Sequence, residues 1–220
     1  PSALIATRYS PASTYYSADG GATWVERKSG LPSSDARRIA VSSVPGQMEH
    51  LVAVVSNNSH GFKGFYYSTD FGLTWTEKAN SPNLLGWEVD GSDEGGQGWY
   101  DLAIAAKNEN EIWVGGVNIW KTLDGGSNWE LHAHWYGGGG KPYVHADQHY
   151  FVKHPYKDEL LIGNDGGLYR YKLQTDQYTD ISDGLAITQY YRLSTSPFDT
   201  LAIMGGAQDN GTAQFKSGNW

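Results

Sequence analysis

The sequence SADGGATW at Ser17–Trp24 returns as STDFGLTW at Ser68–Trp75 and as TLDGGSNW at Thr122–Trp129. The closing tryptophans stand at positions 24, 75 and 129. This period is close to the roughly 40–50 residues that one four-stranded propeller blade occupies. The repeat therefore predicts an all-β protein, a β-propeller of four-stranded blades.

The repeated motif has the chemistry of a turn. Its aspartate can accept hydrogen bonds from nearby backbone N–H groups, its glycine supplies a positive φ, and its tryptophan packs the hairpin. We therefore expect a structural role, and no ligand contact, for Asp19 with Trp24, Asp70 with Trp75, and Asp124 with Trp129.

Alternating apolar runs between the motifs predict strands, and no window has the i, i+3, i+4, i+7 pattern of a capped helix. A later unit, around LLIGNDGGLYRYKLQTDQYTDI, keeps the strand pattern and loses the motif's glycine and tryptophan. The chain then divides into the end of a preceding blade at 1–32, blades at 33–86, 98–136 and 143–185, and the start of a further blade at 187–220. We expect all of these to form one partial propeller domain.

The composition argues against two classes of binding partner. The formal net charge is -8 and no basic run occurs, so neither nucleic acid nor an anionic membrane is an expected partner. Apolar runs are too short for membrane insertion, and cysteine is absent. Because the chain starts at Pro1 and its first methionine is Met48, we expect a processed or truncated product whose remaining blades belong to a longer parent chain.

Polar residues precede the first strand of each predicted blade. Aligning the blades on Pro45, Asn108, Pro155 and Pro197 brings two sets of residues into register: Arg37, Tyr100, Asp147 and Gln189, and beside them Arg38, Asp101, Gln148 and Tyr190. We expect these residues to form a polar ring at the mouth of the channel. Exposed aromatic side chains nearby, Trp99 among them, would suit stacking on sugar rings.

The segment richest in candidate metal ligands and catalytic groups is HAHWYGGGGKPYVHADQHYF, residues 132–151. On an extended strand His145, Asp147 and His149 would point to one side, where they could hold a divalent metal such as calcium or zinc. His132 or His134 could add a ligand if the loop folds back. Alternatively, the histidines bond to neighbouring loops and Asp147 caps a turn.

Two further segments that contain aspartate have, first of all, the composition of turns. NDGG at 164–167 and QDNG at 208–211 follow apolar strands of adjacent blades, so Asp165, Gln208 and Asp209 could share an environment. The loop VDGSDEGGQGW at 89–99 offers oxygen ligands without the spacing of an EF-hand loop.

With GWYDLAIA, VGGVNIWKTLDGGSNW, YVHADQHYF, GNDGGLYRY, ITQYYRL and GGAQDNGT, the chain resembles the secreted sialidase-like repeat propellers of Bacteroidetes bacteria, with Asp-box (BNR) or YVTN-type repeats and export by the type IX secretion system. The resemblance implies a seven- or eight-bladed propeller that is extracellular or on the cell surface. Sialidases of this kind use three arginines, a tyrosine paired with a glutamate, and an acidic aspartate. Arg37 and Arg38 stand in RRIA, which departs from the family's FRIP pattern, so classical sialidase activity is not expected.

Three hypotheses follow. The first is a non-catalytic module that binds a glycan or a protein ligand at the channel mouth. The second is a glycoside hydrolase with paired carboxylates drawn from Asp101, Asp147, Asp165 and Asp209. The third is a purely structural module of a large surface protein.

Overall fold

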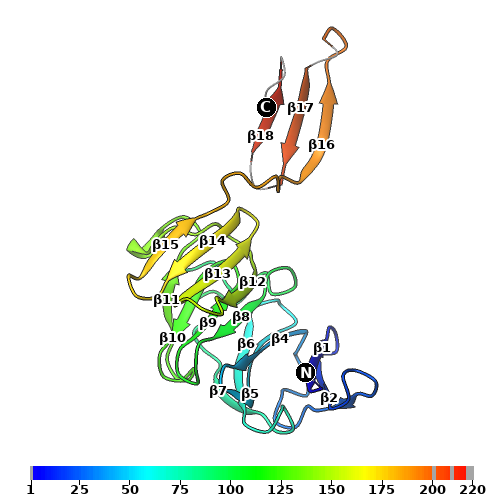
Figure 1. The fold of residues 1–220 in the computed structure, drawn as a ribbon, viewed down its shortest axis with the longest axis vertical. Helices are drawn as coiled ribbons and strands as arrows, with labels where there is room; N and C mark the ends of the chain where they lie inside the picture. Colours follow the sequence, from blue (N-terminus) through cyan, green and yellow to red (C-terminus); the bar gives the residue numbers. More distant parts are fainter. Residues whose placement is uncertain (1, 200–201, 209–210, 217–220) are drawn as a thin grey trace.

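The chain folds into a series of antiparallel sheets. The computed structural model describes residues 2–199, 202–208 and 211–216, and within these the strands form five sheets in chain order (Figure 1). One short 3-10 helix, η1 (Gly138–Gly140), lies in the connection between the third and fourth of these sheets.

Three of the sheets have four strands. Their bounds are β4 (Arg38–Val44), β5 (Gln47–Ser56), β6 (Phe62–Ser68) and β7 (Thr76–Ala79); β8 (Ala103–Ala106), β9 (Ile112–Gly115), β10 (Ile119–Thr122) and β11 (Glu130–Ala133); β12 (Gln148–Lys153), β13 (Glu159–Asn164), β14 (Gly167–Lys172) and β15 (Gln177–Asp180). Within each sheet, neighbouring strands follow one another in the sequence, as expected of hairpin-connected blades.

The first and last sheets each have three strands. They are β1 (Leu4–Arg8), β2 (Ser13–Ser17) and β3 (Val25–Glu26), and β16 (Tyr190–Thr195), β17 (Ile203–Ala207) and β18 (Thr212–Phe215). Figure 1 shows the first four sheets along an arc and the β16–β18 sheet standing away from them.

The four-stranded sheets pack face to face. Alternation along β8 sends Ile104 and Ala106 into a core shared with the β4–β7 sheet, and Ala103 and Ala105 into a core shared with the β12–β15 sheet. Strand β8 lies beside both β4 and β12, so the first strands of successive sheets are neighbours. Residues just before these strands are therefore brought to one place.

The first repeated motif closes the hairpin between β2 and β3 with its own hydrogen bonds. Asp19 Oδ1 accepts the backbone N–H of Thr23 at 2.9 Å, and Asp19 Oδ2 accepts the Thr23 hydroxyl at 2.6 Å. Ser17 Oγ accepts the N–H of Gly21, and Trp24 Nε1 donates to the Gly21 carbonyl. Bonds from Thr23 and Ser17 lower the pKa of Asp19 to about 2.

The second and third motifs repeat this arrangement. Asp70 accepts the N–H of Thr74 at 2.9 Å, and Asp124 accepts the N–H of Asn128 at 2.9 Å. Thr122 takes the place of serine in the third motif, and its hydroxyl donates to Asp124. All three carboxylates thus bond within their own hairpins.

The motif also joins neighbouring sheets. Gly126 has φ +92°, and a Cβ built on it would lie 2.2 Å from the Phe65 ring of the preceding sheet. The Trp129 ring meets the Phe65 ring edge-on at 5.1 Å between centroids. Glycine is therefore required here both by the turn and by the contact between sheets.

We expect Asp70→Ala to lower the free energy of unfolding by about 1 kcal/mol at pH 7, the usual cost of removing a side chain that caps backbone N–H groups. Although burial opposes it, hydrogen bonding by Thr74 and Ser68 lowers the pKa of Asp70 below its ordinary 3.8. The stabilisation is therefore present above the unfolded pKa and is lost as pH falls through the folded value. Thermal unfolding at pH 7 and at pH 3 should show a gap between variant and parent that narrows in acid.

The matched control is Asp183→Ala, at an exposed aspartate in the connection between β15 and β16. It should leave the unfolding temperature unchanged. Equal destabilisation by both substitutions would contradict the structural role of the motif.

Candidate functional site

A hydrogen-bonded cluster surrounds Asp165, in the turn after β13. The Tyr100 hydroxyl donates to its Oδ2 at 3.0 Å, and His149 Nε2 bonds to its Oδ1 at 2.6 Å. Gln208, just after β17, donates to the Tyr100 hydroxyl oxygen at 3.3 Å. Burial and the Asp165 carboxylate raise the pKa of Tyr100 to about 12, so the phenol keeps its proton and remains a donor.

A carboxyl pair, Asp101 and Asp147, adjoins this cluster. Burial, followed by the charge of Asp147 and a hydrogen bond with it, raises the pKa of Asp101 to about 8. Neither oxygen of the fully buried Asp101 carboxylate has a hydrogen bond of ordinary geometry among the described residues, so we take Asp101 as the protonated member, facing Asp147. Gln97 Nε2 donates to Asp147 Oδ1 at 3.0 Å, and Arg38 donates to the Tyr100 carbonyl at 3.0 Å.

The backbone separates the three residues that an extended strand would align. Asp147 has φ +63°, in the left-handed region, and β12 begins only at Gln148 with a bulge before Tyr150. The expectation that His145, Asp147 and His149 share one strand face is therefore wrong. His149 bonds to Asp165, whereas His145 Nδ1 lies 3.3 Å from the Ala146 carbonyl oxygen.

The arrangement of His145, Asp147 and His149 does not support a metal site. In the described parts of the chain, no three side chains among histidine, cysteine, aspartate and glutamate are grouped as a metal site. His132 lies between Tyr171 and Tyr178, with its Nδ1 2.6 Å from the Tyr178 hydroxyl. Burial lowers the pKa of His132 to about 4, which keeps the imidazole neutral.

An aromatic pocket opens beside Asp147. Its volume is about 710 Å³, and four partly exposed aromatic side chains line it together with Gln97, His145 and Asp147: Trp87, Trp135, Tyr136 and Tyr143. The Trp135 and Tyr136 rings are nearly perpendicular, at 86°, with centroids 4.7 Å apart. The pocket thus offers flat apolar walls with a carboxylate and an amide at one side.

Two buried side chains hold the connections that form this pocket. Asn118 donates to the carbonyls of Gly86 and Trp87, and its Oδ1 accepts the N–H of Trp135. His134 Nδ1 accepts the N–H groups of Tyr136 and Gly138, so its Nε2 is the donor to the Trp87 carbonyl at 3.3 Å. These residues tie residues 80–102, between β7 and β8, to residues 134–147, between β11 and β12.

The other candidate residues that the structure describes make different contacts. Arg37 Nε donates to the Tyr9 hydroxyl at 2.8 Å, toward the first sheet. Trp99 is half exposed and packs on Tyr100. The Gln189 carbonyl accepts the N–H of Gln208. Tyr190 covers Gly205, and Asp209 lies outside the described residues.

The acidic loop after Val89 serves as a connection. Asp93 Oδ2 accepts the N–H of Trp87 at 2.6 Å, and Asp90 accepts the N–H of Ser92. Gln97 belongs to the same loop, and nothing in the sequence pattern distinguished it from its neighbours. Its contact with Asp147 joins the aromatic pocket to the carboxyl cluster.

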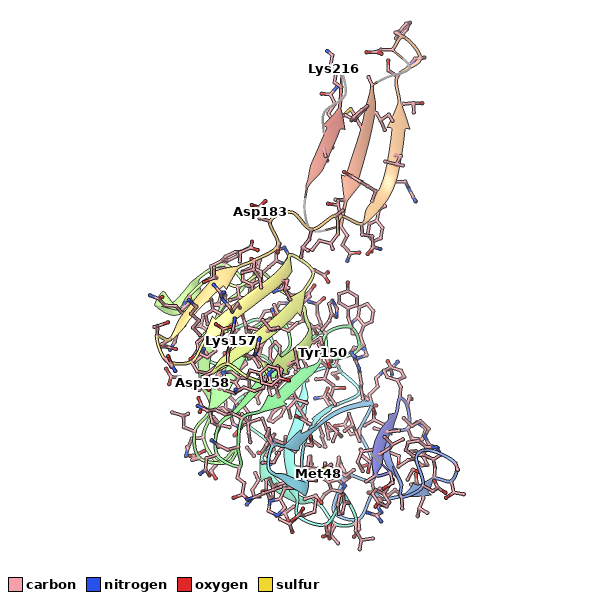
Figure 2. The ribbon with its side chains drawn as sticks, in the orientation of Figure 1. Met48, Tyr150, Lys157, Asp158, Asp183 and Lys216 are labelled. Atoms are coloured by element: carbon pink, nitrogen blue, oxygen red, sulfur yellow. The ribbon has the colours of Figure 1, made fainter. Side chains whose placement is uncertain are left out.

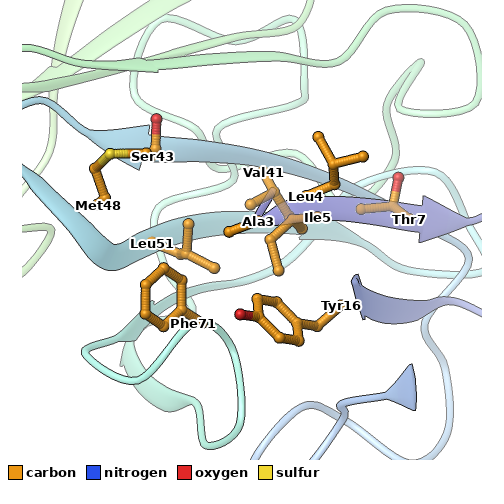
Figure 3. Close-up of a pocket in the computed structure, with 10 residues that line it drawn as sticks. All are labelled: Ala3, Leu4, Ile5, Thr7, Tyr16, Val41, Ser43, Met48, Leu51 and Phe71. Carbon is orange, nitrogen blue, oxygen red and sulfur yellow. The ribbon is translucent and has the colours of Figure 1, made fainter. Parts of the chain in front are cut away.

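A second pocket, of about 380 Å³, lies between the first two sheets (Figure 3). Leu4, Ile5 and Val41 are among its apolar walls, with the Tyr16 and Phe71 rings at one side. None of its lining residues carries a charge. Its chemistry is that of a packing space between sheets.

The fold is a β-propeller with Asp-box repeats. The BNR/Asp-box repeat model matches residues 15–26 and 66–77, and the hydrogen bonds of the third hairpin have the same pattern. No curated protein matches the sequence. Across the described parts of the chain, no helix has the length and apolar character needed to cross a bilayer.

Solved structures share this architecture at low sequence identity. The chain is similar to YCF48 bound to D1 peptide, with a TM-score of 0.53 and 16% identity, over 93% of this chain and 58% of that one. It is also similar to the GH74 xyloglucanase of Xanthomonas campestris, with a TM-score of 0.53 and 12% identity, over 99% of this chain and 35% of that one. The chain thus spans about half or less of these propeller proteins, and the likeness shows the fold alone.

We expect Asp101→Asn to change how stability depends on pH. The folded pKa, about 8, lies above the ordinary 3.8, so the proton on Asp101 stabilises the fold fully in acid, and this contribution is lost as pH rises to about 8. The amide removes this dependence. Thermal unfolding should therefore favour the variant increasingly from pH 5 to pH 8, and the difference should level off above pH 8.

Asp183→Asn provides the control, because that carboxylate is exposed. It should show no such trend. A gap between Asp101→Asn and the parent that stays constant from pH 5 to pH 8 would disprove the buried proton.

Proposed function

We propose that this propeller module binds a glycan in the pocket between Trp87, Trp135, Tyr136 and Tyr143. The observation that carries the proposal is four aromatic side chains, each between 40% and 62% exposed, that line one cavity. Aromatic faces stack on the apolar faces of sugar rings, and Gln97 and Asp147 supply hydrogen bonds to hydroxyl groups at the pocket's edge. The module is accordingly proposed to act at the cell surface or outside the cell.

Rigidity of the pocket supports binding. Asn118 and His134 are almost fully buried and fix the backbone on both sides of the cavity. A wall that is already ordered loses little conformational entropy when a ligand arrives. Gln97 supports the same proposal, since its Nε2 donates to Asp147 Oδ1 and holds that carboxylate at the edge of the pocket.

Glycoside hydrolysis is the second candidate, favoured by the protonated Asp101 beside Asp147. A general acid must reach the glycosidic oxygen, and the Asp101 side chain is fully buried. Among the candidates that the structure describes, this leaves Asp147 and Asp165 as an acting pair. The fold itself decides nothing, since it is shared by a xyloglucanase and by a protein bound to a peptide.

We expect the purified chain to bind at least one glycan on a glycan array. Calorimetry with that glycan should then give a measurable Kd. Trp135→Ala and Tyr136→Ala should each weaken binding on the order of tenfold, because each removes a stacking surface. Tyr156→Ala is the matched control, since that ring is 93% exposed and lies outside the pocket. It should bind like the parent.

Binding that survives both pocket substitutions, or no binding to any glycan, would refute the proposal. A turnover assay distinguishes the glycoside hydrolase from a module that only binds. Incubation with xyloglucan oligosaccharides and with the selected glycan should release no reducing sugar. Release that is abolished by Asp147→Asn would instead establish the hydrolase.

A further inference from the structure

The aromatic pocket is negatively charged at one side. Among the described residues that line it, Asp147 is the only carboxylate, and none is a lysine or an arginine. Burial, followed by the charge of Asp147, raises the pKa of Asp101 to about 8. At neutral pH the proton of this carboxyl pair therefore stays on the buried Asp101, and the negative charge stays on Asp147 at the wall of the pocket.

Two cationic side chains from the surrounding segments bond elsewhere. Arg38 donates to the Tyr100 carbonyl at 3.0 Å, and Lys141 pairs with Glu130 at 2.7 Å. Neither cation is among the described residues that line the cavity. A ligand in the pocket therefore meets aromatic rings and a carboxylate at its walls.

His145 is the lining residue that can become positive. Its Nδ1 lies 3.3 Å from the Ala146 carbonyl oxygen. Although burial opposes it, hydrogen bonds from Ser182 and the charge of His145 lower the pKa of Asp180, on β15. A protonated His145 is thus compensated by a carboxylate that is not among the residues lining the pocket.

The aromatic walls also favour a cation. The Trp135 and Tyr136 rings are nearly perpendicular, and Trp87 and Tyr143 line the same cavity. The face of an aromatic ring is the negative part of its quadrupole, and several rings around one cavity form a cage for ammonium groups. Because the cavity, at about 710 Å³, is much larger than an ammonium group, the walls can also stack on the ring that carries it.

We propose that the glycan bound here carries free amino groups, as β-1,4-linked glucosamine does, and that one ammonium lies between the Asp147 carboxylate and the aromatic rings. This ligand class rests on the proposed function of the same pocket. An ammonium donates a charge-assisted hydrogen bond to the carboxylate, whereas an N-acetyl or hydroxyl group donates an ordinary one. The same carboxylate repels sugars that carry a carboxylate of their own.

Calorimetry on the full chain at pH 6 compares two tetrasaccharides of equal length and linkage: chitosan tetraose, with free amines, and chitin tetraose, with N-acetyl groups. We expect chitosan tetraose to bind on the order of tenfold tighter. Tetralysine with blocked ends controls for the net charge of -8, since it has as many amines and no sugar ring. It should bind on the order of tenfold more weakly than chitosan tetraose.

Asp147→Asn tests the carboxylate directly. Asparagine adopts a positive φ as aspartate does here, at +63°, so the substitution removes the charge and suits the backbone. It should bring the ratio of the two Kd values close to one. The matched control is Asp183→Asn, which removes an exposed carboxylate from the connection between β15 and β16 (Figure 2) and should keep the parent's ratio.

Equal affinity for the two sugars, or a preference for chitin tetraose, would overturn the inference. The proposed function would still stand if Trp135→Ala weakened that binding. Tetralysine that binds as tightly as chitosan tetraose would also overturn the inference, because net charge would then explain the preference, and so would a preference that Asp147→Asn retains. Failure to bind these sugars and every glycan on the array would refute the proposed function together with the inference.

Discussion

Burial of both faces of the inner blades, β4–β7 and β8–β11, is the constraint on which the structure depends. Along β8, Ile104 and Ala105 are neighbours in sequence, yet they enter different cores. A shift of one residue would exchange the two cores, so the register must be held by the turns. The repeated motif does this: its aspartate bonds the backbone of its own hairpin, and its glycine and tryptophan fit against the sheet before it.

The face-to-face packing of the blades also explains why polar side chains cluster in one place. Because first strands of successive blades are neighbours, residues at their beginnings meet, and Arg38 of one blade donates to the Tyr100 carbonyl of the next. The connections between blades are less repetitive than the strands. They carry Trp87 on one side and Trp135, Tyr136 and Tyr143 on the other, so an individual ligand pocket arises on a repeated framework.

Sequence reasoning reached the fold because its signals are local. A turn motif at a constant period needs no knowledge of distant contacts, and the predicted all-β propeller is confirmed. Alignment of the blades also brought the polar residues before each first strand into register, and the ring that they are expected to form at the channel mouth stays a prediction. Their roles in ligand binding remain predictions.

Local signals could not give the geometry of the site. The positive φ of Asp147 breaks the strand pattern without a glycine, so the expected alignment of His145 with His149 failed. Asn118 and His134 hydrogen-bond to backbone carbonyls more than 30 residues away in the sequence. Such contacts cannot be predicted from residue spacing. The Asp101 proton likewise depends on burial, which appears only when the blades are assembled.

Hydrogen exchange on the full chain, with and without a glycan selected on the array, is the sharpest test of ligand binding at the aromatic pocket. If the pocket built by the two connections is the binding site, bound glycan should slow exchange within residues 86–99 and 134–147 and leave the three Asp-box hairpins unchanged. Slowed exchange at the hairpins or in the apolar pocket between the first two sheets, with none in the two connections, would contradict it.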